Sequence, residues 1–130
     1  MKKLVLYFLF IITNFLNAQC WQKVSMGSHH ALAIKNDGSL WSWGANFYGQ
    51  LGDGTSVSKS SPVQIGFSQD WSVISAGAGH SMAIKNDGTL WAWGFNKFGQ
   101  LGDGTHTDIN IPTQIGQAKD WVFISANTYF

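Results

Sequence analysis

The chain has 130 residues with eight basic and seven acidic side chains, and its single cysteine excludes an intrachain disulfide. Every basic residue is a lysine and every acidic residue an aspartate, so the chain has no arginine for a bidentate phosphate clamp and too little positive charge for a nucleic-acid partner. Fifteen glycines and seven tryptophans, with no glutamate or arginine, favour strands and turns over helices.

The N-terminus has the pattern of a secretory signal peptide. Two lysines precede an apolar run over residues 4–12, which is shorter than the roughly 20 residues that a spanning helix needs. We therefore predict a signal peptide over residues 1–18, cleaved after Ala18, and a secreted, periplasmic or cell-envelope protein without a membrane span. A buried core helix is the alternative. Gln19 is not the small residue that lipidation of Cys20 requires, so an anchor there is not expected.

The rest of the chain is a tandem repeat with a period of 50 residues. Residues 21–70 align with residues 71–120 without a gap, and 27 of the 50 positions are identical. All seven tryptophans fall on repeat-equivalent positions. The pattern predicts one repeat over residues 19–70, a second over 71–120 and the start of a truncated third over 121–130.

Each repeat is predicted to contain about four strands. In chain order these are an apolar strand at 31–35, a return strand at 39–44, a strand beginning at Pro62, and a strand at 71–76 that enters the next repeat. Asp37-Gly38 predicts a tight type I′ turn between the first two. Four short strands at this period are typical of β-propeller blades, so the expected fold class is all-β.

Residues 75–105 include Trp-Gly-x-Asn-x-x-Gly-Gln-Leu-Gly-Asp-Gly, and this motif resembles the regulator-of-chromosome-condensation repeat. The resemblance implies a seven-bladed β-propeller, of which this chain supplies about two and a fifth blades. Founding members of the family exchange guanine nucleotide on a nuclear GTPase and dock on nucleosomes. Others occur in ubiquitin ligases and kinases, or are secreted bacterial binding proteins. The signal peptide makes this chain similar to the secreted members, in an apparently truncated form.

The resemblance also implies structural roles for the residues of the repeat signature. In the first repeat these are Gly27, His30, Asp37, Gly38, Trp41, Trp43, Gly44, Asn46, Gly49, Gln50, Leu51, Gly52, Asp53 and Gly54. In the second they are Gly77, His80, Asp87, Gly88, Trp91, Trp93, Gly94, Asn96, Gly99, Gln100, Leu101, Gly102, Asp103 and Gly104.

Two sets of signature residues could bind a metal. Histidines at 30 and 80 could meet near a central shaft, but we expect each to tie its own blade together by a hydrogen bond. Asp53 and Asp103 could belong to calcium loops, but each Gly-Asp-Gly-Thr segment has one carboxylate and no Asp-x-Asp spacing, so turn stabilisation is favoured. We expect no metal and no cofactor.

The Trp-x-Trp pairs could stack on sugars or form a protein contact. Alternation along a strand places Trp41 and Trp43 on one face, and Trp91 and Trp93 likewise. Repetition favours packing between adjacent blades, because an internal interface recurs in every blade and a binding site need not.

Positions that differ between the repeats are the candidates for partner binding. Variable loops at one end of a propeller usually carry function. The candidates are Phe47, Tyr48, Lys59, Phe95, Lys97, Phe98, His106 and Asp108.

The sequence contains no Gly-x-Ser-x-Gly elbow and no phosphate loop. We therefore expect a non-catalytic module that binds a protein or a glycan. Nucleotide exchange is the alternative, implied by the resemblance alone. Two blades are few for a repeat protein, so we expect a homo-oligomer or a fragment of a longer chain.

Overall fold

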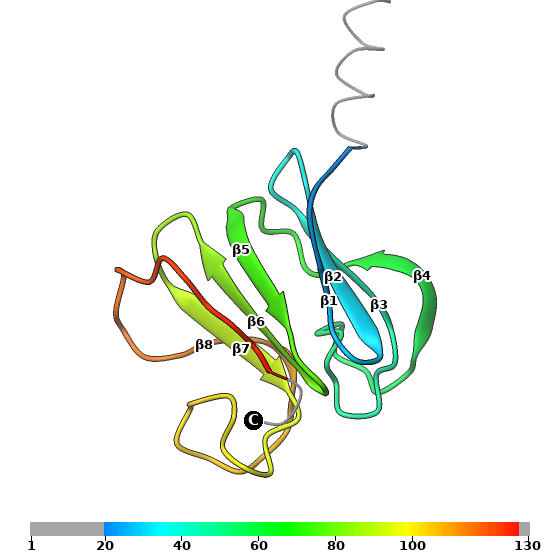
Figure 1. Cartoon of the computed structure of the whole chain (residues 1–130), viewed down its shortest axis with the longest axis vertical. Coiled ribbons are helices and arrows are strands. Elements are labelled where there is room, and N and C mark those ends of the chain that lie inside the picture. The colour runs from blue at the N-terminus through cyan, green and yellow to red at the C-terminus, as the bar shows by residue number, and fades with distance from the viewer. Residues whose placement is uncertain (1–19, 128–130) are drawn as a thin grey trace, which may run out of the picture.

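The computed structural model describes residues 20–127, which form two four-stranded antiparallel sheets. The first sheet, here the first blade, contains β1 (Trp21–Met26), β2 (His30–Lys35), β3 (Leu40–Gly44) and β4 (Lys59–Gln64). The second blade contains β5 (Trp71–Ala76), β6 (His80–Lys85), β7 (Leu90–Gly94) and β8 (Ile109–Gln114). Strands follow chain order in both sheets (Figure 1). The prediction of an all-β fold with four-stranded blades is confirmed. The predicted signal peptide at 1–18 and residues 128–130 lie outside the described residues.

The hairpin between β2 and β3 differs from the predicted type I′ turn. That turn needs positive φ at two central residues, but no non-glycine residue between 20 and 127 has positive φ. Instead Gly38 alone is left-handed, with φ 81°, and Lys35 pairs with Ser39 across a three-residue loop. Asp37 Oδ1 accepts from the Ser39 N–H at 3.0 Å, which explains why Asp precedes Gly here.

Strand β4 begins at Lys59, three residues earlier than expected, so Pro62 lies inside the strand and not at its start. The proline is tolerated because β4 is the edge of its sheet and pairs with β3 alone. The ladder has an irregularity between Ser42 and Gly44, where the pairing shifts from Val63 to Lys59.

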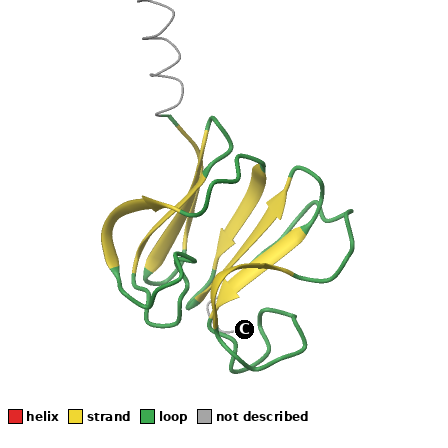
Figure 2. Ribbon diagram, turned by 180° about the vertical axis from the view of Figure 1, so that it is seen from behind, coloured by secondary structure: helices red, strands yellow, loops and turns green. Residues whose placement is uncertain are grey.

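The main core lies between the two blades, which stack face to face (Figure 2). The first blade contributes Leu32, Ile34 and Leu40 to this core, and the second contributes Trp71 and Trp93. Burial of this apolar surface is what joins the two sheets into one unit. Within residues 20–127 the structure contains no helix of the length and apolarity needed to cross a membrane.

Residues 121–127 restart the pattern on the far side of the second blade. The Trp121 N–H donates to Gly88 O at 3.2 Å, as the Trp71 N–H donates to Gly38 O at 3.2 Å one repeat earlier. Ile124 is 9% exposed and packs with Ile84 and Leu90. The segment therefore lies where the first strand of a following blade would lie.

Candidate binding face on the long loops

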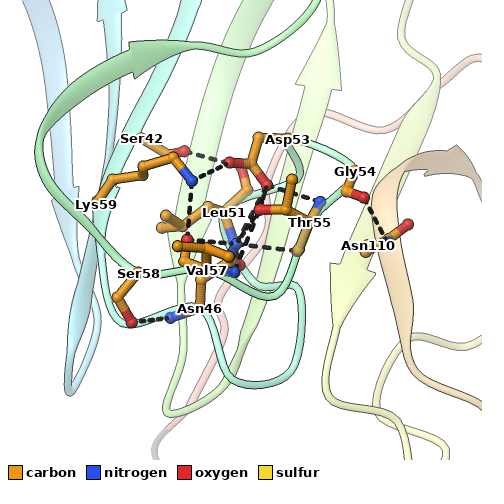
Figure 3. A network of polar contacts seen from close by, with 10 residues as sticks. All are labelled: Ser42, Asn46, Leu51, Asp53, Gly54, Thr55, Val57, Ser58, Lys59 and Asn110. Carbon is orange, nitrogen blue, oxygen red and sulfur yellow. Dashed lines mark hydrogen bonds and ion pairs between the residues drawn. The ribbon is translucent and has the colours of Figure 1, made fainter.

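The long loop between β3 and β4 is organised around a buried amide (Figure 3). Asn46 is fully buried, and its Nδ2 donates to Asp53 Oδ1 (3.2 Å), Thr55 O (3.0 Å) and Val57 O (3.1 Å). Its Oδ1 accepts from the Leu51 N–H at 3.0 Å. One side chain thus closes a loop that has no regular secondary structure, which makes the loop a rigid platform.

The second long loop repeats this network one period later. Asn96 Nδ2 donates to Asp103 Oδ1 at 3.1 Å and to Thr107 O at 3.0 Å, and the Leu101 N–H donates to Asn96 Oδ1 at 3.1 Å. The two loops lie at the same end of the two sheets (Figure 1). The repeat therefore presents two similar rigid loops side by side.

Asp53 and Asp103 serve these loops as hydrogen-bond acceptors. Partial burial acts to raise the pKa of Asp53, but hydrogen bonds from Thr55, Lys59 and Asn46 outweigh it and hold that pKa below its ordinary value. A backbone hydrogen bond from Thr105 leads the causes that lower the pKa of Asp103. Both carboxylates are thus ionised at neutral pH and bonded within their own loops.

The rigid loops carry four aromatic side chains, and we call this set the aromatic loop face: Phe47, Tyr48, Phe95 and Phe98. The rings of Tyr48 and Phe95 lie 4.7 Å apart across the junction of the blades, and those of Phe95 and Phe98 lie 5.8 Å apart. Phe47 is 75% exposed and Phe98 69%. The loops therefore hold a patch of apolar rings in contact with solvent.

A cleft of about 360 Å³ borders the aromatic loop face. It is lined by Phe47, Tyr48, Ser56, Asp108, Ile109 and Asn110. The cleft draws its walls from both blades, so it exists only because the blades are packed together. The cleft adds a polar side to the aromatic patch.

The other candidate residues have more varied positions. Asp108 lines the cleft, and its Oδ1 also accepts from the Asn96 N–H at 2.8 Å. His106 Nδ1 lies 3.1 Å from Lys97 O on the second loop, and both side chains are exposed. Lys59 makes an ion pair with Asp53 at 3.1 Å, and this pair fixes the lysine to the base of its own loop.

The prediction that each histidine ties its own blade together is wrong for His30, whose bond reaches the neighbouring blade. His30 Nε2 lies 2.8 Å from Ser81 Oγ, and Ser81 Oγ donates to Gln50 O at 2.7 Å. Since the single serine proton goes to Gln50, His30 Nε2 is the donor to Ser81. Trp93 Nε1 also donates to Gln50 O, at 2.9 Å. We call the hydrogen bonds from His30 through Ser81 to Gln50 the histidine relay. It crosses the junction of the blades because β2 of one blade faces the next.

Burial, with smaller contributions from the charges of His80 and His29, lowers the pKa of His30 to about 4. Burial also lowers the pKa of His80. Both rings are therefore neutral at pH 7. In residues 20–127 there is no group of three or more His, Cys, Asp and Glu side chains placed to hold a metal ion.

The tryptophan pairs divide between the interior and the surface. Trp93 has no exposed area and lies in the core between the blades, whereas Trp43 is half-buried on the open side of the first blade. Lys85 Nζ lies 4.5 Å from the Trp91 ring centre, so its ammonium covers that ring. A sugar-stacking surface made of Trp91 and Trp93 is thus not available.

Several of the residues that join the two blades were not predicted from the sequence. Ser81 and the main-chain oxygen of Gln50 join the two blades, and Asn110 Nδ2 donates to Gly54 O at 3.0 Å. Ser81 replaces Ala31 of the first repeat, so its place among the variable positions was the available signal.

Comparison with known families identifies these blades. The pattern of the Regulator of chromosome condensation (RCC1) repeat matches residues 37–84 and 87–128. A second pattern for the same repeat matches residues 21–50 and 71–100. The chain belongs to the RCC1 repeat family.

RCC1 repeats of known proteins align with about a third of this chain. The ultraviolet-B receptor UVR8 of Arabidopsis thaliana is 42% identical over 48 residues, which are 37% of this chain and 11% of the receptor. Human HERC3, whose name is probable E3 ubiquitin-protein ligase, is 43% identical over 51 residues, 38% of this chain and 5% of HERC3. The chain thus spans only a small part of these relatives, and the repeats occur both in a receptor and in a named enzyme.

Solved RCC1-type structures share the arrangement of the two blades. Prp20p from Saccharomyces cerevisiae superposes with a TM-score of 0.76 at 21% identity, covering 84% of this chain and 29% of Prp20p. Human WBSCR16 superposes with a TM-score of 0.73 at 26% identity, covering 83% of this chain and 29% of that protein. These likenesses establish the propeller-blade fold of the RCC1 repeats.

Proposed function

We propose that this RCC1 repeat chain is a non-catalytic module that binds a protein through its aromatic loop face, outside the cytoplasm. The observation that carries the proposal is that residues of the repeat signature are buried, whereas residues at variable positions are exposed. Signature residues such as Asn46, Leu51 and Trp93 are buried inside or between blades, whereas Phe47 and Phe98, which vary between repeats or flank variable positions, are exposed.

The aromatic loop face has the physical properties of a protein-binding patch. Aromatic side chains dominate the energetics of many interfaces because they bury large areas and have few rotatable bonds. The networks around Asn46 and Asn96 fix the loops in advance, so binding has a smaller ordering cost. Asp108, Lys97 and His106 are exposed polar residues of the loop that carries Phe95 and Phe98, and interface rims are polar in the same way.

A non-catalytic role is supported by the state of the titratable groups. The groups with shifted pKa in the described part of the chain are two buried histidines and four aspartates. The four aspartates each accept hydrogen bonds within a turn or loop. A shifted pKa here has a structural cause, so it does not point to an acid or base for catalysis.

A protein partner is favoured over a glycan because Trp93 is enclosed and Trp91 is covered by Lys85. Nucleotide exchange has the support of the resemblance alone. Prp20p is described as binding Gsp1p and histones, but the likeness to it at 21% identity concerns the fold.

The proposed location rests on the signal-peptide pattern of residues 1–18, and N-terminal sequencing of exported protein that begins at Gln19 would support it.

Site-specific photo-crosslinking in the producing cell tests the binding face. A photoreactive residue is placed at Phe47 or Phe98 on the aromatic loop face, and at Phe67 as the matched control, since Phe67 is a 96% exposed phenylalanine of the β4–β5 connection. We expect positions 47 and 98 to yield the same adduct with another protein and position 67 to yield none.

With the captured protein purified, Phe47→Ala and Phe98→Ala are each expected to weaken binding about tenfold, as is usual for an aromatic hot spot. Phe67→Ala should leave the affinity unchanged. Equal labelling from all three positions, or adducts between copies of this chain only, would contradict the proposed binding face.

A further inference from the structure

The second long loop has a negative charge at a position where the first loop has a neutral side chain. In the second blade, Asp108 Oδ1 accepts from the Asn96 N–H at 2.8 Å. At the equivalent position of the first blade, Ser58 Oγ accepts from the Asn46 N–H at 3.1 Å. A neutral hydroxyl thus supplies the acceptor that the loop requires, so the charge of Asp108 is not needed to hold its loop closed.

This charge has no partner of opposite sign in the part of the chain that the structure describes. The ion pairs between residues 20 and 127 involve Lys59 and Lys85, and both lysines bind other aspartates. Lys97 and His106 belong to the same loop as Asp108, and neither forms an ion pair with it in that range. The carboxylate of Asp108 therefore brings an unbalanced negative charge to the cleft that it lines.

The rest of the cleft consists of aromatic rings and polar acceptors. Phe47 is 75% exposed and Tyr48 is 43% exposed, and both line the cleft. Asn110 Nδ2 donates to Gly54 O at 3.0 Å, which leaves the Oδ1 of the same amide as an acceptor. Ring faces and oxygen acceptors beside a carboxylate are the surroundings that attract a cation.

The two walls of the cleft are fixed against each other at the junction of the blades. Gly49 has φ 75°, and a Cβ there would lie 2.6 Å from Asn110 Cβ, so the backbone of the first loop packs directly on the second blade. The rings of Tyr48 and Phe95 lie 4.7 Å apart across the same junction. A cleft with such walls is formed before a ligand arrives, which reduces the ordering cost of binding.

We propose that this cleft binds a cationic side chain, an arginine or a lysine, of the protein partner. The inference rests on the proposed function and specifies the chemistry at one point of the aromatic loop face. The cation lies against the rings of Phe47 and Tyr48 and pairs with the Asp108 carboxylate. Arginine fits better than lysine, because its planar guanidinium stacks on aromatic rings while it donates to a carboxylate.

NMR titration of the isotope-labelled chain with three capped tripeptides tests the cleft itself. The central residue is arginine, lysine or citrulline, and citrulline has the shape of arginine without its charge. We expect the arginine peptide to shift the amide signals of Tyr48, Asp108 and Asn110 until they saturate, and the lysine peptide to bind more weakly. The citrulline peptide should leave the signals unchanged. Equal shifts with citrulline, or no saturable shift with either charged peptide, would overturn the proposal.

Asp108→Ser copies Ser58 of the first blade, so it removes the charge and keeps an acceptor for the loop. We expect it to weaken binding of the arginine peptide about fivefold, the contribution of one exposed ion pair, and the difference should disappear in about 1 M salt. Asp108→Asn retains the shape of the side chain and should give the same loss.

Asp120→Asn is the matched control, because it removes the same charge from an exposed aspartate beyond the other end of β8. Its affinity for the arginine peptide should equal that of the unchanged chain. An equal loss in Asp120→Asn and Asp108→Ser would indicate a general attraction between the chain and the peptide, and would refute a specific cation site.

Binding of the captured partner separates this inference from the proposed function. If Phe47→Ala weakens that binding and Asp108→Ser does not, the aromatic loop face stands and the cation site is refuted. If no protein is captured at positions 47 and 98, the protein-binding function is refuted, and the peptide titration still decides whether the cleft binds a cation.

Discussion

The two blades have 27 identical positions of 50, yet equivalent residues have different environments. Trp93 is enclosed, whereas Trp43 is half-buried, and Gly52 is buried, whereas Gly102 is exposed. The asymmetry arises because the two blades pack through opposite faces. Each blade therefore buries a different face at the junction. Contacts within a blade, such as those of Asn46 and Asn96, are the same in both. Repetition of sequence thus reproduces the blade, while position in the stack decides what each blade buries.

The largest expected difference between the blades concerns the paired tryptophans. Trp93→Ala removes a buried indole from the core and leaves a cavity, so we expect a loss of about 4 kcal/mol in the free energy of unfolding. Trp43→Ala should cost about 1 kcal/mol, because its ring is partly solvated. Urea unfolding measures both losses. Equal losses would refute the assignment of Trp93 to the junction.

The histidine relay predicts a loss of stability in acid. The pKa of His30 is about 4 in the folded chain against 6.5 for the free side chain, so the unfolded chain binds more protons between these values. The contribution of His30 to stability is therefore complete above about pH 6.5, falls as the pH is lowered, and is lost near pH 4, a change of about 3 kcal/mol. His30→Gln should remove this part of the pH dependence and leave the smaller part that the lowered pKa of His80 contributes. An unchanged profile would exclude His30 as its source.

The buried side-chain amides of Asn46 and Asn96 test a feature that the two blades share. Asn46→Ala and Asn96→Ala each leave several buried loop groups without a partner, and each should cost about 2 kcal/mol. Both networks lie within one blade, but the first loop also carries contacts to the second blade at Gln50 O and Gly54 O, so Asn46→Ala should cost the more of the two. Denaturant unfolding gives the values. Equal losses would show that Asn46 does not hold the junction contacts in place.

The smallest expected effect concerns the ion pair that one blade has and the other lacks. Lys59 lies 3.1 Å from Asp53, whereas the equivalent position in the second blade is Ile109. Lys59→Met should reduce the free energy of unfolding by about 0.5 kcal/mol, and the difference should vanish in 1 M salt. A salt-independent loss would indicate that packing of the lysine stem, not charge, stabilises this loop.

Local features of the fold were accessible from the sequence. The order of strands, the loops closed by Asn46 and Asn96, and the turn role of Asp37 depend on residues close together in the chain. The turn type was mistaken because Asp37-Gly38 is compatible with both two-residue and three-residue loops. The extra length of β4 was missed because Pro62 suggests a strand start unless the strand is known to be an edge.

The residues of the candidate site could be identified from the sequence, but their contacts across the two blades could not. Differences between the repeats indicated Phe47, Tyr48 and Phe98, but a ring contact of 4.7 Å between Tyr48 and Phe95 depends on how one blade sits on the next. The same holds for the relay from His30, whose partner is 51 residues away. Spacing along the chain specifies a position within a blade and leaves the neighbour across the junction open.

The sequence by itself determined the unit: a 50-residue period, four strands, and loops closed by their own side chains, all produced by short-range hydrogen bonding and alternation. Only the tertiary structure decided which residues of each copy of that unit are buried. The reason is that the hydrophobic core lies between the sheets, so Trp71 and Trp93 are enclosed by residues of another blade, while Trp21 and Trp43 keep the same sequence context and remain open to solvent.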